Sequence, residues 1–425
     1  MAVAVGAAGN SDAGFASLKV LYSYPGAIGS PGTGAIAWHQ VNQLVRSGHD
    51  VTLVVASVAR AVVGIRSIVR SLDFGGRRIP ERTIGRTRVY AWHDMRARRV
   101  LSAGTFDVVH TWPFAGVRTL ELAQRLGVAA LREAPGSHYA AACAAVSREY
   151  ALLGLQIPSV WERFGDGDRM DIEEREYAAA TALLVPSDAV ANSFLSRGYD
   201  SSHLIRHQYG FDPTEIRVPV REVEHPFTAV FVGRCVPRKG LHYAVRAWLS
   251  SRASETGRLL IYGPFDPDYR DLLRASLAHP SVRVCGPTDK LGSAYAKADV
   301  LLLPSVEEGS ALVSYEAQGA GVIPLVSTAS GARVDHGVNG LVHEVGDVET
   351  LAAQLDLLSE QEKVRRVLRT EALTRAQQLT WTAAGRSLVN AYRVALDQPV
   401  EYAHGRPSER SSERSSRNWD DSAVS

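Results

Sequence analysis

The chain has 425 residues, of which 45% are hydrophobic and 22% charged, and its formal net charge is +2 at pH 7. This length exceeds what one hydrophobic core usually supports, so we expect two domains of ordinary size. A nearly neutral charge argues against a nucleic-acid-binding protein. No apolar run approaches the roughly 20 residues that a membrane-spanning helix needs.

The cysteines and the N-terminal residues bear on the cellular compartment. Cys143, Cys235 and Cys285 show no C-x-x-C spacing, which predicts buried thiols in a reducing, cytoplasmic location. Residues 1–17 are rich in Ala, Gly and Ser and lack a basic region before an apolar one, so we predict a flexible N-terminus and no signal peptide. No metal site is expected, because the sequence has no Asp-x-Asp motif or histidine cluster suited to hold one.

Short aliphatic runs alternate with helical stretches along the chain. Such runs are too short for helices and are typical of buried parallel strands. They comprise residues 18–24, 51–57, 107–112, 129–134 and 182–187, followed by residues 228–234, 258–263, 282–286, 300–304 and 322–327. Because repeated strand-helix-strand units form parallel sheets covered by helices on both faces, the two series predict two Rossmann-like domains of the α/β class.

The boundary between the domains is predicted within residues 210–226, which are polar, contain three prolines and interrupt the alternation. We therefore predict an N-terminal domain over residues 18–212 and a C-terminal domain over residues 213–380. A helix follows at residues 381–396. Residues 397–425 are predicted to be disordered, because their Ser, Arg and Asp content leaves almost nothing apolar to bury.

The first candidate ligand loop spans residues 29–35, between the first strand and the helix that follows it. Its glycines permit close approach of a ligand to the backbone. A dinucleotide-binding fingerprint has the order G-x-G-x-x-G immediately after the strand, whereas this loop reads G-x-x-G-x-G several residues later. An NAD-dependent oxidoreductase is therefore a weaker alternative.

The second candidate loop carries two cations. A strand ends at Gly233, Arg234 follows it, and Lys239 comes five residues later at the start of a helix. Arginine binds oxygens in a bidentate manner and lysine supplies a mobile charge, a combination that suits a diphosphate leaving group. Alternatively, Arg234 and Lys239 are two solvated loop cations that bind no ligand.

The third candidate loop lies between a strand that stops at Pro304 and a helix predicted to start near Ser310. Its backbone N–H groups open onto the N-terminus of that helix, which suits an anion such as a diphosphate. Glu308 and Glu316 stand eight residues apart across it. Glu316 could accept hydrogen bonds from ribose hydroxyls and Glu308 could reach a polyol. A helix-dipole partner and a solvated helix residue would give the same spacing.

Residues 304–321 resemble the E-x7-E region of the retaining glycosyltransferases of family four, the glycosyl transferases group 1. The resemblance implies a GT-B fold, in which two Rossmann-like parallel-sheet domains face a cleft. It also implies that Glu308 approaches the donor sugar and that Glu316 binds the ribose of the nucleotide. The implied donor-binding residues are Gly34, Arg234, Lys239, Glu308, Gly309, Ser310, Ala311, Leu312, Val313 and Glu316. The segment GSAL departs from the usual Gly-Phe-Gly-Leu of the family.

Other segments extend the resemblance from about residue 19 to residue 396. Gly34 and His39 keep the spacing of the N-terminal loop of the family, although Ala35 replaces its second glycine. Arg234 and Lys239 match the G-R-x-x-x-x-K-G diphosphate site. Residues 381–396 resemble the last helix of the family, which crosses back onto the first domain.

The acceptor side is harder to assign. Glu133 and His138 follow a strand of the first domain, where the family carries a histidine that contacts the transferred sugar, and the sequence leaves open which of them matches. The predicted catalytic residues are His138, Glu133 and Glu308. His110 and Gly32 are further candidates on the acceptor side. A buried structural histidine is the alternative for both histidines.

Residues 59–100 contain eleven arginines and three acidic residues, interleaved with aliphatic residues. Such a stretch could dock on anionic lipid headgroups or bind a phosphorylated acceptor. A solvated loop and helix face would show the same composition.

The resemblance predicts a retaining glycosyltransferase that moves a sugar from a UDP- or GDP-sugar to a hydroxyl of a sugar or lipid-linked acceptor. Glycan, glycolipid or cell-envelope polysaccharide synthesis is the expected context. The nucleotide sugar is a co-substrate, and no further cofactor or metal is expected. A non-catalytic nucleotide-sugar-binding protein is the main alternative. Cytoplasmic localisation is predicted, with peripheral association with the inner face of an anionic membrane as a second hypothesis.

Overall fold

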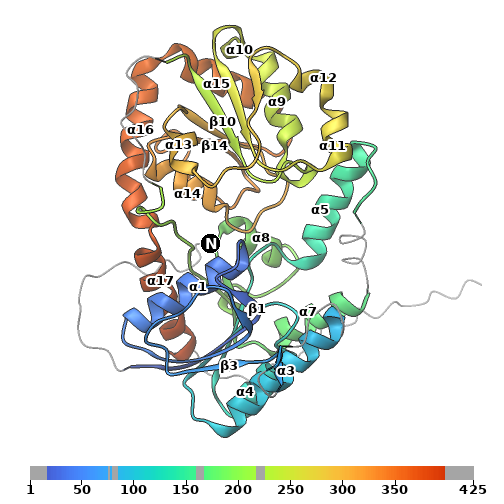
Figure 1. Cartoon of the computed structure of the whole chain (residues 1–425), viewed down its shortest axis with the longest axis vertical. Coiled ribbons are helices and arrows are strands. Elements are labelled where there is room, and N and C mark those ends of the chain that lie inside the picture. Colours follow the sequence, from blue (N-terminus) through green and yellow to red (C-terminus); the bar gives the residue numbers. More distant parts are fainter. Residues whose placement is uncertain (1–16, 75–76, 79–84, 159–166, 217–224, 398–425) are drawn as a thin grey trace, which may run out of the picture.

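The computed structural model describes residues 17–74, 77–78, 85–158, 167–216 and 225–397. They form two parallel sheets, each covered by helices on both faces (Figure 1). The predicted α/β class with two Rossmann-like domains is confirmed. The residues predicted to be flexible or disordered, 1–17 and 397–425, lie outside the described part except for Ser17 and Asp397.

The first sheet has seven strands in the order β3-β2-β1-β6-β7-β8-β9, and all neighbours are parallel. These strands are β1 (Lys19–Ile28), β2 (Asp50–Val58), β3 (Ser67–Arg70), β6 (Val108–Thr111), β7 (Ala129–Glu133), β8 (Ala182–Val185) and β9 (Leu204–Arg206). The helices of this domain are α1 (Thr33–Arg46), α3 (Arg86–Ala103), α4 (Val117–Arg125), α5 (Tyr139–Leu152), α7 (Gly167–Ala179), α8 (Asp188–Leu195) and the 3-10 turn η2 (Ser201–His203). A small antiparallel ribbon joins β4 (Asp73–Phe74) to β5 (Arg77–Arg78).

The second sheet has six strands in the order β12-β11-β10-β13-β14-β15, again all parallel. These strands are β10 (Thr228–Val232), β11 (Arg258–Tyr262), β12 (Val282–Val284), β13 (Val300–Leu303), β14 (Ile323–Ser327) and β15 (Leu341–His343). The helices that follow β10 are η3 (Pro237–Lys239), α9 (Leu241–Ser250), α10 (Ala253–Thr256), α11 (Pro267–Leu272), α12 (Arg274–Leu277), α13 (Leu291–Tyr295), α14 (Leu312–Gly319), α15 (Val348–Glu360), α16 (Glu362–Ala376), η4 (Gln377–Leu379) and α17 (Trp381–Asp397).

Alternation along the strands builds the core of the first domain. Val20 and Tyr22 in β1 point to the face covered by α1 and α17, whereas Leu21 points to the face covered by α3, α4 and α7. All three side chains are fully buried. Both faces of the sheet are therefore apolar, which explains why the strands read as continuous aliphatic runs.

Helix α17 ends the described chain on the first domain, where it lies beside α1 (Figure 1). The two helices approach closely at Gly385, since a Cβ atom there would lie 2.5 Å from the Cβ atom of Gln43. Leu388 and Tyr392 of α17 are buried in the same core as β1. The chain thus crosses between the domains twice, once before β10 and once before α17.

The two crossing segments lie side by side. The backbone N–H of Phe211 donates to Leu379 at 3.0 Å, and that of Trp381 donates to Phe211 at 3.1 Å. A Cβ atom at Gly210 would lie 2.6 Å from the Thr380 backbone, so only glycine fits this approach.

Two further observations concern membranes and thiols. Among the described residues, no helix combines the length and apolar character needed to cross a bilayer. The prediction of buried thiols is wrong for Cys285, which is exposed, whereas Cys235 is buried. Cys285 follows β12, a strand at the edge of its sheet, where fewer neighbours cover the chain.

Candidate functional site

The carboxyl ends of β10 and β13 bring the two predicted donor loops together. Lys239, at the end of η3, forms an ion pair with the Glu308 carboxylate. The backbone N–H of Val306 donates to Arg238 at 2.9 Å, which fixes one loop against the other. Gly240 has a φ of 68°, and a Cβ atom there would lie 1.9 Å from the Pro304 carbonyl oxygen. Only glycine therefore permits this contact.

The N-terminus of α14 opens beside this ion pair. The helix begins at Leu312, two residues after the predicted start, and no side chain caps it. The Ser310 hydroxyl lies 2.7 Å from the Tyr315 hydroxyl instead. The first-turn backbone N–H groups, those of Leu312 and Val313 among them, thus have no side-chain cap and suit an anionic ligand.

Glu316 lies one turn further along α14 and is partly buried. It accepts a hydrogen bond of 3.1 Å from the Tyr295 hydroxyl. Burial raises the pKa of Glu316 to about 7, and the negative charge of Glu215 adds to that rise. This carboxyl therefore changes its protonation state near neutral pH.

Glu307 is a site residue that the sequence did not single out. It is buried, and its Oε2 atom lies 3.1 Å from the guanidinium of Arg238. Its Oε1 atom accepts a hydrogen bond of 3.2 Å from the backbone N–H of Ser137 in the first domain. The adjacent pair Glu307 and Glu308 is the signal that sequence reasoning had available. One of these carboxylates contacts the first domain and the other contacts Lys239.

The two domains touch at the donor loop. A Cβ atom at Gly309 would lie 1.7 Å from the carbonyl oxygen of Pro135, and one at Gly331 would lie 2.3 Å from the carbonyl oxygen of Gly309. A Cβ atom at Gly331 would also lie 3.0 Å from the hydroxyl oxygen of Ser187, the N-cap residue of α8. Gly309 therefore lets backbone segments of the two domains lie in direct contact, and Gly331 lets two backbone segments of the second domain do the same.

Arg234 lies apart from the ion pair. Its side chain is exposed, and the described residues offer it no hydrogen-bond or ion-pair partner. It stands directly after Gly233, whose φ of 146° turns the chain at the end of β10. The guanidinium is thus available to a ligand at the carboxyl end of the second sheet.

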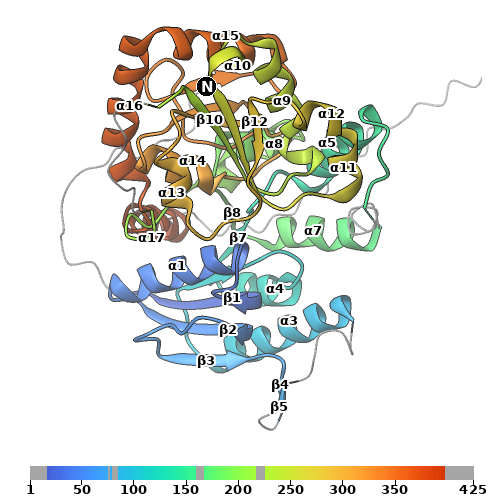
Figure 2. The same ribbon diagram turned by 45° about the horizontal axis from the view of Figure 1, so that its top comes forward.

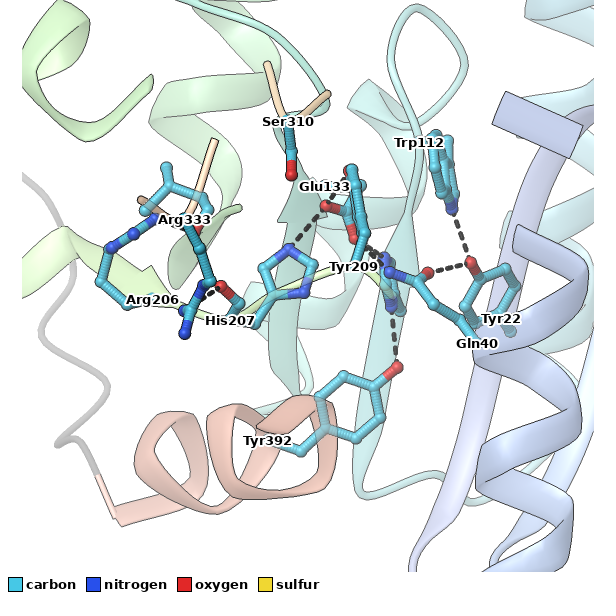
Figure 3. Close-up of polar contacts among 12 residues, drawn as sticks. Tyr22, Gln40, Trp112, Glu133, Arg206, His207, Tyr209, Ser310, Arg333 and Tyr392 are labelled. Carbon is cyan, nitrogen blue, oxygen red and sulfur yellow. Dashed lines mark hydrogen bonds and ion pairs between the residues drawn. The ribbon is translucent and has the colours of Figure 1, made fainter. Parts of the chain in front are cut away.

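Glu133 lies at the end of β7 with no exposed surface (Figure 3). Its carboxylate accepts hydrogen bonds from Tyr209 at 2.9 Å and from Gln40 at 3.0 Å, and it lies 2.8 Å from Nε2 of His207. Burial alone would raise the pKa of Glu133, but His207 and His110 hold it well below its usual value. The carboxylate is therefore charged and fully engaged inside the first domain.

His110 belongs to the same buried network. Its Nε2 atom lies 3.2 Å from the Glu133 carboxylate, and its Nδ1 atom lies 2.7 Å from the hydroxyl of Tyr392 in α17. Burial lowers the pKa of His110, against the effect of Glu133. Tyr22 extends the network, since it donates to Gln40 and accepts from Trp112 (Figure 3).

His138 lies away from this network, directly before α5. Its ring is buried against Phe194 and Tyr177, and its Nε2 atom lies 3.2 Å from the carboxylate of Glu174. Burial lowers the pKa of His138, while Glu174 opposes that change. The structure therefore does not bring His138, Glu133 and Glu308 into one cluster, and their catalytic roles stay predictions.

The glycine loop of the first domain lies at the N-terminus of α1. Gly34 is buried, and a Cβ atom there would lie 2.4 Å from the Ser30 hydroxyl, whereas Gly32 is exposed with a φ of 82°. His39 stacks on the ring of Trp381 with centroids 4.3 Å apart. Burial lowers the pKa of His39 to about 4, so it is a neutral packing residue. Among the described residues, no three His, Cys, Asp or Glu side chains converge to hold a metal ion.

Comparison with known proteins shows which family the second domain resembles. Residues 226–361 match the model of the glycosyl transferases group 1. A D-inositol 3-phosphate glycosyltransferase from Corynebacterium kroppenstedtii is 27% identical over 43% of this chain and 43% of its own length, so the chain spans less than half of that relative. Another from Frankia alni is 28% identical over 77% of this chain and 84% of its own length.

Solved structures share the fold. Sucrose-phosphate synthase from Thermosynechococcus elongatus superimposes with a TM-score of 0.68 and 19% identity, covering 89% of this chain and 98% of that chain. The Anabaena protein HepE, in complex with UDP-glucose, superimposes with a TM-score of 0.62 and 14% identity, covering 88% and 99%. The predicted GT-B fold is confirmed. Residues 226–361, which include Arg234, Lys239, Glu308 and Glu316, are thus similar to the glycosyl transferases group 1.

Proposed function

We propose that this chain transfers a sugar from a nucleoside diphosphate sugar to an acceptor hydroxyl with retention of the anomeric configuration. The observation that carries the proposal is the contact of Lys239 with Glu308 beside the uncapped N-terminus of α14. Burial lowers the pKa of Lys239 well below its usual value, and a bound diphosphate would favour the charged ammonium form. That ammonium group and the helix N–H groups at one point are what a departing diphosphate needs for charge stabilisation.

The donor would lie along the carboxyl ends of the second sheet. Lys239 and the exposed Arg234 neutralise the diphosphate, Glu308 contacts the sugar, and Glu316 accepts hydrogen bonds from the ribose hydroxyls. The bond from the anomeric carbon to the diphosphate oxygen breaks as the acceptor oxygen attacks from the same face. The diphosphate oxygen takes the acceptor proton, so no side chain need act as the base, and the acceptor oxygen itself is the nucleophile.

The domains and the compartment are part of the same proposal. Residues 18–212 would hold the acceptor, and residues 213–380 would hold the donor. UDP-glucose is the first donor to test, since HepE is similar in fold and was solved with it. Relatives named D-inositol 3-phosphate glycosyltransferase support a small polyol as the acceptor. The three free cysteines are compatible with a cytoplasmic location.

The test is turnover of a panel of UDP- and GDP-sugars by the full chain, followed as nucleotide diphosphate release, with the product anomer assigned by NMR. We expect Lys239→Ala to lower turnover of the best donor by about 100-fold or more, the loss typical when one charge-stabilising group is removed. The matched control is Lys297→Ala, since Lys297 is an exposed lysine of the same domain.

Each outcome separates one class of protein. Turnover that survives Lys239→Ala would overturn the diphosphate assignment. Binding of a nucleotide sugar without any turnover across the panel and a range of acceptors would support the non-catalytic alternative. Hydride transfer with a nicotinamide cofactor would instead support an oxidoreductase.

A further inference from the structure

Helix α5 begins on the first domain and ends against the second. It follows β7, and its far end lies beside α11 of the second domain in both views of the fold (Figures 1 and 2). The helix packs against η3, the turn that carries Lys239. Leu153 and Leu155, which follow the helix directly, pack against the apolar core of the second domain. By its contacts, the last part of α5 therefore belongs to the domain that is proposed to hold the donor.

A buried polar cluster anchors this end of α5. The Oε1 atom of Glu149 lies 2.7 Å from Nε2 of His242 in α9, and each of these two side chains is only 4% exposed. The Nδ1 atom of His242 lies 2.7 Å from the hydroxyl of Tyr269 in α11. The other carboxylate oxygen of Glu149 accepts a hydrogen bond of 3.3 Å from the Tyr243 hydroxyl. The proposed reaction does not use any of these four residues, so the cluster serves to hold α5 in place.

The last turn of α5 is fixed by the backbone as well. Gly154 has a φ of 65°, the left-handed conformation that commonly ends a helix. The backbone N–H of Leu155 donates to the carbonyl oxygen of Tyr150 at 3.0 Å, which closes this turn. Tyr150 is the neighbour of Glu149 and is itself buried, with 4% of its surface exposed. Its side chain is therefore held at the boundary between the domains.

The hydroxyl of Tyr150 faces the carboxyl end of the second sheet. Burial and the Asp266 carboxylate raise the pKa of Tyr150, whereas the guanidinium groups of Arg234 and Arg238 oppose that rise. Arg234 follows β10, Asp266 follows β11 and Arg238 lies in η3. Because charge interactions in solution are largely screened beyond about 10 Å, all three groups lie near this hydroxyl.

Two hydrogen-bond donors at this place have no partner in the part of the chain that the structure describes. They are the hydroxyl of Tyr150 and the guanidinium of Arg234. The raised pKa keeps the Tyr150 hydroxyl protonated at neutral pH, so it can donate. A buried polar group without a partner is costly, and an anionic oxygen placed between a hydroxyl and a guanidinium satisfies both.

We propose that Tyr150 is a donor-binding residue supplied by the first domain, whose hydroxyl donates a hydrogen bond to the diphosphate of the nucleotide sugar beside Arg234. The inference rests on the proposed function and adds to the donor site a residue from the domain that would hold the acceptor. Glu149 and His242 are positioning residues, because they act on the diphosphate only through Tyr150. The nucleotide is thus held by both domains, and the anchor of α5 contributes to its affinity.

The test is calorimetry of the full chain with UDP and GDP, followed by comparison of the tighter nucleotide with its parent nucleoside in a displacement assay. Tyr150→Phe keeps the ring and removes the hydroxyl. It should weaken nucleotide binding by about tenfold, the equivalent of one hydrogen bond to a charged group, and leave nucleoside binding unchanged. Tyr90→Phe is the matched control, since Tyr90 packs in α3 within the first domain and should not affect the affinity. Melting temperatures report whether both variants fold.

A double-mutant cycle tests the positioning role. Glu149→Gln weakens the contact with His242, so it should lower nucleotide affinity by about threefold or more in the wild-type background, as expected for coupled neighbours. In the Tyr150→Phe background the same substitution should have almost no effect on affinity. Equal losses in both backgrounds would show that Glu149 affects only the general stability of the protein, and would contradict its positioning role.

The remaining outcomes separate this inference from the proposed function. Unchanged nucleotide affinity in Tyr150→Phe, with turnover of a nucleotide sugar by the wild type, would overturn the role of Tyr150 and leave the function standing. An equal loss for nucleotide and nucleoside would also overturn it, because the contact would then be with the base or the ribose. A tenfold loss for the nucleotide alone, without turnover of any sugar, would support Tyr150 and reject the transferase. If neither nucleotide binds, both proposals are wrong.

Discussion

The carboxylate of Glu307, in the second domain, accepts a hydrogen bond of 3.2 Å from the backbone N–H of Ser137 in the first. The same carboxylate lies 3.1 Å from the Arg238 guanidinium, next to Lys239 and the donor loop. The contact between the domains and the proposed diphosphate site are therefore built from adjacent residues. A substitution that breaks the contact between the domains is therefore expected to alter the proposed diphosphate site as well.

We expect Glu307→Ala to destabilise the protein. The substitution removes a charged acceptor from the partly buried Ser137 N–H and an ion-pair partner from Arg238, and such losses cost about 1–3 kcal/mol. Urea unfolding measures the effect. Glu362→Ala is the control, since Glu362 pairs with Arg366 at 3.8 Å on an exposed helix face and should cost about 0.5 kcal/mol or less. Equal losses in the two variants would contradict the structural role of Glu307.

Glu316 predicts a pH-dependent donor affinity. Its pKa is about 7, and ribose hydroxyls donate more strongly to the ionised carboxylate than to the acid. The ionised fraction of such a group rises about tenfold between pH 6 and pH 8, so affinity for UDP-glucose should rise by a similar factor. Calorimetry at both values measures it. In Glu316→Gln the rise should disappear, and in the exposed-site control Glu344→Gln it should remain.

The same group gives a prediction for stability. Because its pKa is raised in the folded state above 4.5, the folded protein binds this proton more tightly than the unfolded chain does. The stabilisation of the fold by this tighter proton binding is present in full below pH 4.5 and is lost as the pH rises through 7. Thermal unfolding between pH 5 and pH 8 should therefore show a smaller loss of stability in Glu316→Gln than in the wild type. Parallel pH profiles would contradict the assigned shift.

The basic stretch of residues 59–100 predicts weak membrane binding of a purely electrostatic kind. Helix α3 turns its apolar residues Val89, Ala97 and Leu101 inward, where they are buried, while Arg98 and Arg99 are exposed. The described helix therefore has no free apolar stripe to insert into lipid.

Sedimentation with anionic vesicles tests this interpretation. Binding should occur at low salt and disappear at high salt, because screening weakens each charge contact. Replacing Arg98 and Arg99 by Gln should cost about 1 kcal/mol each in vesicle affinity. Lys363→Gln, at an exposed position of the second domain, is the control. Binding that persists at high salt would point to apolar insertion instead, and no binding at low salt would exclude the membrane hypothesis.

The sequence predicts the central strands well because both faces of them are buried. It does not predict β3, whose four residues Ser67–Arg70 lie at the edge of the sheet, half-buried or exposed, within an arginine-rich stretch. The contact of Lys239 with Glu308 could be anticipated, since both residues follow strands of one sheet. The contact of Glu307 with Ser137 could not, because it depends on how two domains pack.

The buried network around Glu133 shows the same limit. The members of this network come from α1, β6, the segment after β9 and α17, so no local sequence pattern predicts them. From the sequence, Glu133 is a polar residue at the end of a strand, the usual place for a ligand contact. In the structure it joins α17 to the first sheet through His110 and Tyr392.

Because of this position, we expect substitution of Glu133 to lower the stability of the fold in the first place, and catalysis only as a consequence. Glu133→Ala leaves two histidines, a tyrosine and a glutamine without the carboxylate that they share, and each buried polar group left unpaired costs about 1–3 kcal/mol. Since the pKa of Glu133 is depressed in the folded state, its contribution is present above pH 4.5 and is lost as the pH falls below that value. Thermal unfolding at pH 7 measures the first effect, and a series from pH 5 down to pH 3 measures the second. Glu349→Ala, at an exposed position in the first turn of α15, should cost about 0.5 kcal/mol.

Glu133→Gln separates folding from catalysis, because the amide keeps the shape of the side chain and removes its charge. We expect a lower melting temperature, with the remaining folded protein still turning over its donor. A variant that melts like the wild type but loses turnover by about 100-fold, as expected for removal of a group that acts in the transition state, would restore the catalytic assignment of Glu133.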